Sequence, residues 1–342
     1  MSVDRGLVVA VDGGGVKTDL ALLDSSGALL SLVRGGGSQA YYLGVEGCVE
    51  VLETLLDRAM ADAGLRSGER PFAATAQVLL AGMDLPEELS ALTVAMERLR
   101  WSERLVLGND TEALLRAGTE RGWGIAVVCG TGINCLGVAS DGQEARFLSF
   151  GPVSGDWGGG RDVGLAALAA AVRAADGRGP RTRLEDAVPA YFGLGDPLDV
   201  ARAFHLGELT ADGLAELAPV VLAVCGEDAV AAGILGRVAD EVVAFARAAL
   251  TRLSLTAADP DVVLGGSVLR AVSTDMVDAV ARRIHEVAPN ARVIVSPSEP
   301  IVGAALLGLD ALGADAAAHA RARAELDSAA AGRSVAVVDR LG

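Results

Sequence analysis

A run of apolar residues that ends in an aspartate and three consecutive glycines constrains this chain more than any other segment. Residues 6–10 and 20–23 are apolar, and between them the chain reads Val11, Asp12, Gly13, Gly14, Gly15, Val16, Lys17 and Thr18. Because glycine has no Cβ, several backbone N–H groups can converge on an anion, and an aspartate at a strand end can hold a hydrated Mg²⁺. The spacing is neither a dinucleotide fingerprint nor a P-loop. It predicts a phosphate-binding β-hairpin, with a ligand-free glycine-rich hairpin as the alternative.

Two further strand-like segments end in glycine turns. One follows residues 127–129 and leads into a second apolar strand that contains Asn134, and the other follows residues 261–264. The turn residues are Gly130, Thr131 and Gly132, and then Gly265, Gly266 and Ser267. Each turn alone could be an ordinary connection. Three such turns over two half-chains favour two similar lobes that hold a nucleotide between them.

Composition narrows the class of protein and of partner. The chain has 342 residues, enough for two domains, and its 51% hydrophobic and 22% charged residues predict a globular protein. A net charge of −16 argues against nucleic acid and anionic membranes as partners. We expect neither a membrane span nor a signal peptide, and therefore a cytoplasmic protein.

The cysteines and histidines point to no metal site. Cys48, Cys129, Cys135 and Cys225 form no Cys-x-x-Cys pair, and the three histidines are isolated in the sequence. The interpretation is that they are buried or surface residues that bind no metal, in a reducing cytoplasm.

Hydrophobic periodicity predicts alternating strands and helices. Strands are expected three times in the first 35 residues and then at 77–81, 104–107, 125–129, 134–138, 146–150, 262–264 and 291–295. Helices are expected at 44–63, at 86–99, through most of 163–252 with breaks near 177–180 and 193–197, and again beyond residue 310. The alternation favours mixed sheets flanked by helices, with a boundary between lobes near residues 114–118.

Asp110 stands between an expected strand and an expected helix. A carboxylate in this place commonly caps the helix by accepting backbone N–H groups. In a cleft that faces the first glycine turn, the same carboxylate could accept a proton from an attacking hydroxyl, since phosphoryl transfer needs little beyond positioning, Mg²⁺ and one base. The spacing does not choose between these roles, and both can hold together.

Two loops carry groups that suit a sugar. Residues 149–160 combine many glycines with Phe150, Asp156 and Trp157, and residues 35–42 combine glycines with Gln39 and Tyr41. Carboxylates and amides accept or donate hydrogen bonds to hydroxyls, and aromatic rings stack on C–H faces. The alternatives are a flexible loop with a capping aspartate for the first and a surface turn for the second.

These motifs together resemble the N-acetylglucosamine kinase branch of the BadF/BadG/BcrA/BcrD ATPase family, within the actin-like sugar kinase superfamily, from about residue 7 to residue 309. The resemblance implies two RNase H-like, actin-like ATPase lobes, each a mixed five-stranded sheet flanked by helices, with a nucleotide cleft between them. It implies ATP and Mg²⁺ as cofactors and Asp110 as the base that deprotonates a sugar 6-hydroxyl. The domains expected are residues 1–115, residues 116–328 with a helical insertion, and a flexible tail at 329–342.

The resemblance also assigns the remaining site residues. ATP is expected at Gly13, Gly14, Gly15, Lys17, Thr18, Gly130, Thr131, Gly132, Gly265, Gly266 and Ser267. The sugar is expected at Gln39, Tyr41, Asp110, Asn134, Phe150, Gly151 and Asp156. Asp12 is expected to hold Mg²⁺ through water.

The chain departs from the family pattern at four positions. Val16 replaces a Thr or Ser of the first turn, Gln39 replaces an Asn, Phe150 replaces a Trp, and Trp157 replaces a Glu. The first change removes a hydroxyl but leaves the turn amides, while the other three bear on the sugar pocket.

The function expected is therefore an ATP:hexosamine 6-phosphotransferase acting on N-acetylglucosamine or glucosamine. One alternative is an ATP-dependent activator of a CoA-ester dehydratase or reductase, which needs two exposed cysteines per chain for an iron–sulfur cluster. Another is a nucleotide-gated sensor without catalysis. The partners expected are ATP and a small amino sugar, and the family alone suggests a homodimer.

Overall fold

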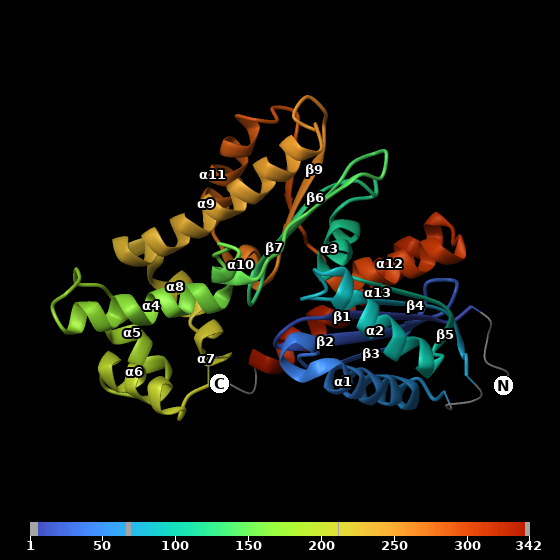
Figure 1. Cartoon of the computed structure of the whole chain (residues 1–342), viewed down its shortest axis with the longest axis horizontal. Coiled ribbons are helices and arrows are strands. Elements are labelled where there is room, and N and C mark those ends of the chain that lie inside the picture. The colour runs from blue at the N-terminus through green and yellow to red at the C-terminus, as the bar shows by residue number, and fades with distance from the viewer. Residues whose placement is uncertain (1–5, 66–69, 211, 339–342) are drawn as a thin grey trace. The chain divides into compact units, whose positions relative to one another are not determined.

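The structure, a computed structural model, describes residues 6–65, 70–210 and 212–338, with side chains up to residue 332. The chain divides into two compact units, of which the first is Met1–Gly122 with Ser296–Gly342 and the second is Trp123–Val295 (Figure 1). Each unit is described by itself below.

Both units combine strands and helices. The first unit contains β1 (Val8–Gly13), β2 (Lys17–Leu23), β3 (Leu29–Gly36), β4 (Ala73–Leu80), β5 (Ser102–Gly108), α1 (Ala40–Asp62), α2 (Pro86–Leu99), α3 (Asp110–Gly118), α12 (Pro300–Leu312) and α13 (Ala316–Val338). The second unit contains the strands β6 (Gly124–Cys129), β7 (Ile133–Val138), β8 (Glu144–Arg146), β9 (Asp261–Gly265) and β10 (Arg292–Val295). Its helices are α4 (Gly160–Ala175), α5 (Leu184–Tyr191), α6 (Pro197–Leu206), α7 (Asp212–Ala215), α8 (Ala218–Val224), α9 (Ala229–Arg252), α10 (Ser267–Ala271) and α11 (Thr274–His285), with 3₁₀ turns η1 (Gly151–Val153) and η2 (Cys225–Glu227).

The two sheets share one topology. Their strand orders are β3-β2-β1-β4-β5 and β10-β9-β6-β7-β8. In the first sheet β1 pairs antiparallel with β2 and parallel with β4, and in the second β6 pairs antiparallel with β7 and parallel with β9. The predicted α/β fold with two mixed five-stranded sheets flanked by helices is therefore confirmed. The repeat of strand and glycine turn seen in the sequence corresponds to this repeat of topology.

The central strands of the first sheet are covered on both faces. Every residue of β1, and every residue of β2 except Lys17, is buried, as expected for strands between two helical layers. Successive side chains of a strand point to opposite faces. Val9 and Val11 accordingly join α1 and α2 in one apolar cluster, while Val8 and Ala10 join α12 and α13 in another.

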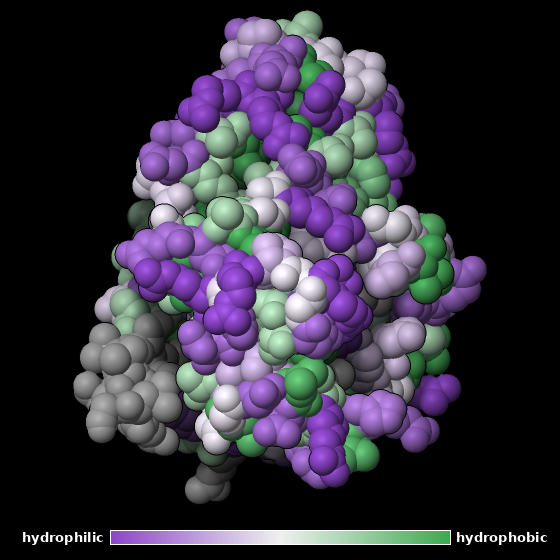
Figure 2. Space-filling model, turned by 90° about the vertical axis from the view of Figure 1, so that its left-hand side faces the viewer, coloured by the Kyte–Doolittle hydropathy of each residue, from purple (hydrophilic) through white to green (hydrophobic). Residues whose placement is uncertain are grey.

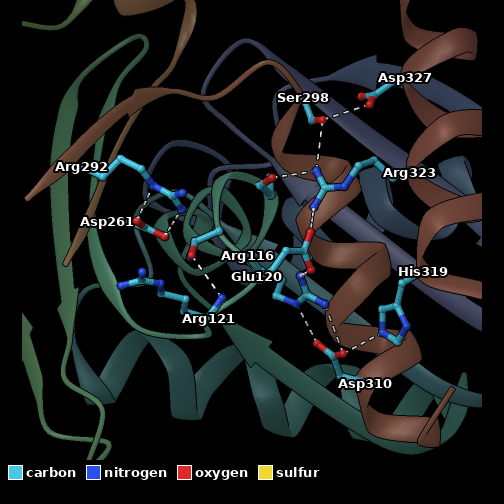
Figure 3. Close-up of polar contacts among 12 residues, drawn as sticks. Arg116, Glu120, Arg121, Asp261, Arg292, Ser298, Asp310, His319, Arg323 and Asp327 are labelled. Atoms are coloured by element: carbon cyan, nitrogen blue, oxygen red, sulfur yellow. Dashed lines mark hydrogen bonds and ion pairs between the residues drawn. The ribbon is translucent and has the colours of Figure 1, made fainter. Parts of the chain in front are cut away.

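The second unit has one large core. Side chains of β6 and β9 pack with those of α4, α5, α8 and α9 in a single apolar cluster. The helices between β8 and β9 confirm the predicted helical stretch, and α4 and α5 end at Ala175 and Tyr191, where glycine- and proline-rich breaks were expected. At the outer edge of this sheet, the guanidinium of Arg292 donates two hydrogen bonds of 2.9 Å to the buried carboxylate of Asp261 (Figure 3).

The strand predicted at residues 146–150 is wrong in its position. The third strand of this sheet, β8, lies at Glu144–Arg146 and pairs with β7 only that far. Ser149 has a φ of 52° and Gly151 a φ of 66°. These left-handed conformations turn the chain out of the extended path that a strand needs, so the loop begins earlier than the apolar pattern indicates.

The C-terminal segment packs against the first unit. α12 approaches α3 so closely that a Cβ on Gly303 would lie 1.8 Å from the carbonyl oxygen of Ala113. From α13, Arg323 donates to the carbonyl oxygen of Ala117 at 2.7 Å and to the carboxylate of Glu120 at 2.8 Å (Figure 3). A small residue and two ordered hydrogen bonds therefore fix both helices on this unit.

Further polar contacts support the same docking. Arg116 donates to the carboxylate of Asp310 at 2.8 Å, and a ring nitrogen of His319 lies 2.7 Å from the same carboxylate (Figure 3). Ser298 donates to Asp327 at 3.0 Å.

This arrangement differs from the expected domain division. The sequence places residues 296–328 with the second lobe, whereas their contacts group them with the first unit. Helix α13 also continues to Val338, through much of the segment expected to be a flexible tail. The last four residues of that expected tail, 339–342, lie outside the described residues.

The length and apolarity of the helices and the hydropathy of the surface can be compared with what a membrane-spanning protein needs. Within the part of the chain that the structure describes, no single helix has the length and apolarity to cross a bilayer, although the bent pair Asp212–Glu227 and Ala229–Arg252 passes that test when taken together. On the face of the molecule shown in Figure 2, hydrophilic and apolar residues are interspersed.

Candidate functional site

Three aspartates lie at or just beyond the carboxyl ends of three neighbouring parallel strands in the first unit. Asp12 lies opposite Leu79 in the register of β1 and β4, and Leu79 lies opposite Gly108 in the register of β4 and β5. The three strands therefore end at one edge of the sheet. Asp12 is the penultimate residue of β1, Asp84 lies in the loop after β4, and Asp110 is the first residue of α3 after β5. We call Asp12, Asp84 and Asp110 the acidic edge.

The cap of α3 is Asn109 rather than Asp110. The side-chain oxygen of Asn109 accepts hydrogen bonds from the backbone N–H of Thr111 at 3.0 Å and from its hydroxyl at 2.6 Å. An asparagine in this place satisfies the free amides of the first helical turn. The capping role considered for Asp110 thus belongs to its neighbour.

The carboxyl of Asp110 has a strongly raised proton affinity. Burial of the carboxyl, together with the negative charges of Asp12 and then Asp84, raises the pKa of Asp110 to about 8, against the opposing effect of backbone hydrogen bonds. Burial and like charges both disfavour the ionised form of a carboxyl. Part of the residue still reaches solvent. A basic carboxylate that a substrate can approach is well suited to accept a proton.

The first glycine turn is held by its neighbours. The N–H of Gly14 donates to the carbonyl of Lys17 at 2.8 Å, and the N–H of Ser38 donates to the carbonyl of Gly14 at 3.1 Å. A Cβ on Gly13 would lie 2.3 Å from the hydroxyl of Ser38, and a Cβ on Gly37 would lie 2.2 Å from the carbonyl oxygen of Gly15. Only glycine allows this close packing, which gives the turn a defined shape beside Asp12.

The side chains of Lys17 and Thr18 have partners inside the first unit. The ammonium of Lys17 lies 2.6 Å from Glu299 and 3.4 Å from Asp19. The hydroxyl of Thr18 is fully buried and donates to the hydroxyl of Ser38 at 2.8 Å. Both residues are predicted to bind ATP, and in the structure their side chains contact other residues of the first unit and support the turn.

The two candidate sugar residues of the first unit differ in their surroundings. Gln39 precedes α1, and its amide nitrogen lies 3.0 Å from the place that a Cβ of Gly82 would take. Because Gly82 follows β4 shortly before Asp84, Gln39 lies close to the acidic edge. The side chain of Tyr41 is 77% exposed, and its ring meets the ring of Tyr42 edge-on, with 5.0 Å between the ring centres.

In the second unit the turn of Gly130, Thr131 and Gly132 packs against the start of α4. The N–H of Gly160 donates to the carbonyl of Gly130 at 2.7 Å, and a Cβ on Gly159 would lie 2.3 Å from the Cα of Gly132. The turn is therefore as tightly supported as its counterpart in the first unit.

The third glycine motif lies beside the second. β9 runs parallel to β6, with Gly265 opposite Val128, so the two strands end at the same edge. Gly266 has a φ of 89°, and a Cβ there would lie 2.3 Å from the carbonyl oxygen of Cys129. Ser267 then begins α10. The structure thus brings together the two motifs of this unit that were predicted to bind ATP.

The sugar-binding candidates of the second unit form one hydrogen-bonded loop. The hydroxyl of Ser149 donates to the amide oxygen of Asn134 at 2.5 Å. The N–H of Phe150 donates to the hydroxyl of Ser154 at 2.7 Å, and that hydroxyl donates to the carboxylate of Asp156. The loop closes through the N–H of Asp156 and the carbonyl of Gly151, 3.0 Å apart.

Trp157, one of the departures from the family pattern, has a local partner. The guanidinium of Arg237 lies over its ring, 4.0 Å from the ring centre. Such a cation over an indole face is an attractive arrangement. The residue that replaces the family's Glu is therefore packed against α9.

Sequence reasoning missed Asp84 and the capping role of Asn109. Asp84 follows an apolar strand and shortly precedes a helix that begins with Pro86, which is the same order of strand, acid and helix that singled out Asp110. That repeated order was the signal available in the sequence.

The acidic edge fits a magnesium ion that is held mainly by other ligands. In the described ranges of the chain, no group of three or more His, Cys, Asp or Glu side chains could hold a metal ion by itself. Mg²⁺ in phosphoryl-transfer enzymes keeps several waters and takes one or two carboxylates together with substrate phosphates. The buried carboxylate of Asp12, beside the glycine turn, supplies a hard oxygen ligand of this kind.

The cysteines do not form a cluster-binding set. Burial raises the pKa of both the Cys129 and the Cys135 thiol, and Cys129 donates to the carbonyl of Gly158 at 2.6 Å. Both side chains lie within the core of the second unit. Metal ligation requires accessible thiolates, so these two residues do not suit an exposed iron–sulfur cluster.

Comparisons with known proteins agree with this geometry. The sequence model of the BadF/BadG/BcrA/BcrD ATPase family matches residues 9–308. An N-acetylmuramic acid/N-acetylglucosamine kinase of Clostridium acetobutylicum is 27% identical over 301 residues, which cover 88% of this chain and 97% of that protein. An N-acetyl-D-glucosamine kinase of Dictyostelium discoideum is 25% identical over 323 residues, covering 90% and 99%.

The fold is shared with a solved structure. A Chromobacterium violaceum protein, provisionally named an N-acetylglucosamine kinase, superposes with a TM-score of 0.71 at 25% identity, covering 89% of this chain and 99% of that one. The family match extends over both sheets and includes every residue of the acidic edge and of the three glycine turns. This chain belongs to the BadF/BadG/BcrA/BcrD ATPase family.

Proposed function

We propose that the protein is an ATP-dependent kinase that phosphorylates the 6-hydroxyl of an amino sugar, N-acetylglucosamine or glucosamine. Membership of an ATPase family supports ATP as the phosphate donor. The names of two relatives that align over most of the chain support an amino sugar as the acceptor. The observation that carries the proposal is the acidic edge, where Asp110 is a basic carboxylate next to a supported glycine turn.

Asp110 is the proposed base. It accepts the proton of the sugar hydroxyl while the hydroxyl oxygen forms a bond to the γ-phosphorus of ATP. The bond between that phosphorus and the β–γ bridging oxygen breaks, and ADP leaves with the electron pair. Little covalent chemistry is required of the protein in such a transfer, so orientation and charge neutralisation supply most of the rate.

The glycine turns are the proposed phosphate contacts. The turns 13–15 and 130–132 bind phosphate oxygens through amides that are not already used within the turns, as those of Gly14 and Gly130 are. Gly265, Gly266 and Ser267 contact the adenosine. The expected nucleotide cleft between the lobes is part of this proposal. Asp12 would hold Mg²⁺ through water, and the ion supplies neutralisation of the phosphate charge. Lys17 and Thr18, whose side chains support the first turn, are also proposed to contact ATP.

The proposed sugar contacts are Gln39 and Tyr41 in the first unit and Asn134, Phe150, Gly151 and Asp156 in the second. Gln39 lies near the acidic edge, and Asp156 is fixed in its loop by Ser154. Hydroxyl recognition by ordered carboxylates and amides gives strong discrimination, because a substrate that lacks the hydroxyl leaves these groups unpaired. The cytoplasmic location, the homodimer and the exclusion of nucleic acid and membrane partners stay predictions.

The test is ADP release from ATP and Mg²⁺ across a panel of hexoses, hexosamines, N-acetylhexosamines and N-acetylmuramic acid, with a control that lacks sugar. The proposal expects strong stimulation by N-acetylglucosamine or glucosamine and none by its 6-deoxy analogue. ADP release that is independent of sugar would contradict it and favour an activator-type ATPase. No release with any sugar would favour a sensor.

A further inference from the structure

A short chain of hydrogen bonds joins Asp84 to the start of α3. The amide nitrogen of Asn109 donates to the carboxylate of Asp84 at 2.8 Å. The amide oxygen of the same side chain accepts from the backbone N–H of Thr111 at 3.0 Å and from its hydroxyl at 2.6 Å. Because a carboxylate can only accept from an amide, the partners at both ends fix which way the Asn109 amide points.

The two ends of this chain are themselves anchored. The backbone N–H groups of Asp84 and Leu85 donate to the carboxylate of Glu88 at 3.2 and 3.0 Å. The backbone N–H of Asn109 donates to the carboxylate of Glu112 at 3.3 Å. Each loop after a parallel strand is thus tied to the first turn of the helix that follows it, and the Asp84–Asn109 bond ties the two loops together.

The hydrogen bond between Asp84 and Asn109 involves a buried amide, so its loss is unfavourable. Asn109 and Thr111 are each 1% exposed. A buried amide that loses its partner is left unsatisfied, which is more unfavourable than the loss of one solvent-exposed hydrogen bond. Asp110 lies between these two residues in the chain, so the hydrogen bonds of the Asn109 amide restrain the backbone that carries the Asp110 carboxyl.

We propose that Asp84 is a positioning residue for catalysis: by holding the Asn109 amide, it sets the orientation in which Asp110 reaches the sugar hydroxyl. This inference rests on the proposed function, since it needs Asp110 to act as the base. It assigns Asp84 no contact with the sugar or with ATP. Catalytic groups must be held within a fraction of an ångström of their productive place, and outer partners of this kind typically affect activity by about 10- to 100-fold.

The first experiment measures steady-state kinetics of Asp84→Ala and Asp84→Asn with the preferred sugar. Asp84→Ala should lower kcat by about 10- to 100-fold while the KM values for ATP and sugar stay within about twofold. Asp84→Asn keeps an oxygen that can accept from Asn109 and should retain more of kcat than the alanine variant. Asp57→Ala, which removes an exposed carboxylate from α1 of the same unit, is the matched control and should leave kcat unchanged.

The second experiment reverses the bond. Asn109→Asp alone sets two carboxylates against each other and should lower kcat at least as much as Asp84→Ala does. Adding Asp84→Asn to it restores an amide–carboxylate bond of opposite direction and should recover about tenfold of that loss, a coupling that independent sites do not show. Melting temperatures of wild type, the two single variants Asn109→Asp and Asp84→Asn, and the double variant should show the same coupling. This measurement does not depend on the enzyme's activity.

The outcomes separate this inference from the proposed function. An active wild type whose Asp84→Ala variant keeps kcat within twofold would overturn the positioning role alone. A rise in the sugar KM with unchanged kcat would also overturn it, because it would assign Asp84 to sugar contact. A wild type that releases ADP equally with and without sugar would overturn both proposals, even with the coupling in melting temperature intact.

Discussion

The ammonium of Lys17 lies 2.6 Å from the carboxylate of Glu299, although the two residues are 282 positions apart in the chain. Glu299 is the residue immediately before α12, in the segment where the chain returns to the first unit. The same carboxylate accepts from Arg34 at 2.8 Å, and Arg34 forms two hydrogen bonds of 2.8 and 2.7 Å with Asp19. The first glycine turn is therefore tied through charges to a helix from the far end of the sequence.

The Arg34–Asp19 pair predicts a large effect on stability. Asp19 is fully buried, so Arg34→Met removes its ion pair of 2.7 Å and leaves the buried carboxylate with the longer contact to Lys17, at 3.4 Å. Removing one partner of a buried ion pair destabilises a protein by about 3–5 kcal/mol, whereas replacing both is much less harmful. Urea unfolding should show this loss for Arg34→Met and a smaller one for Arg34→Met with Asp19→Asn. A single variant within about 1 kcal/mol of wild type, well short of that range, would be inconsistent with the pair.

Gly266 is predicted to be required for its shape. Its φ of 89° and the carbonyl of Cys129, 2.3 Å from the place of a Cβ, leave no room for alanine. Gly266→Ala should lower the free energy of unfolding by about 1–3 kcal/mol and raise the KM for ATP. The matched control is Gly233→Ala in α9, where nothing lies near an added Cβ and alanine favours the helix by up to about 1 kcal/mol. Equal ATP kinetics in both variants would remove Gly266 from the proposed nucleotide site.

Asp110→Asn is predicted to separate catalysis from binding. Loss of a general base lowers kcat by about 10²- to 10⁴-fold, while calorimetric titration with a non-hydrolysable ATP analogue should give an unchanged affinity. The cap of α3 is Asn109, so the helix should form normally. Activity within threefold of wild type would exclude Asp110 as the base.

The pH dependence follows from the raised pKa of Asp110, which burial first and the charges of Asp12 and Asp84 second bring to about 8. The ionised form is the base, so kcat/KM should rise with pH and level off above about 8. A profile that is flat between pH 6 and about 9 would contradict this assignment.

The contribution of Asp110 to the stability of the fold should fall as pH rises, whereas kcat/KM should rise. The folded state binds the Asp110 proton more tightly than the unfolded chain, where the ordinary pKa is 3.8. The group therefore has no effect below that pH and destabilises the fold increasingly as pH rises through the interval to about 8. Asp110→Asn removes the penalty, and thermal unfolding should show a stabilisation that grows from pH 4 to pH 8, with the melting temperature of the variant above that of wild type at the upper end. A variant less stable than wild type at pH 8 would refute the sign.

Much of the fold can be predicted from short-range sequence patterns. The strand and glycine turn around Gly13 depends on neighbouring residues, and so does its repeat at Gly130. Both strand–turn units are present as expected, and the shared topology of the two sheets follows from their repetition. Helix α2 likewise begins at Pro86, where its first turn was predicted.

Features that depend on distant packing were not predictable in this way. The docking of α12 on the first unit needs the close approach of Gly303 to Ala113, which no local pattern reveals. The bond between Asp84 and Asn109 spans 25 positions, and only the register of β4 and β5 brings their loops together. The end of β8 was misplaced because a left-handed serine, Ser149, interrupts an otherwise strand-like run.

The central claim is that phosphoryl transfer goes from ATP to the 6-oxygen of an amino sugar with Asp110 as the base. The most direct measurement follows the reaction of ATP, Mg²⁺ and N-acetylglucosamine by phosphorus and proton NMR, with wild type and Asp110→Asn side by side. We predict a phosphate ester on carbon 6, formed in step with ADP by wild type and at least about 10²-fold more slowly by the variant. Phosphate released to water at a rate that the sugar does not change, or an ester formed equally fast by both proteins, would contradict the account.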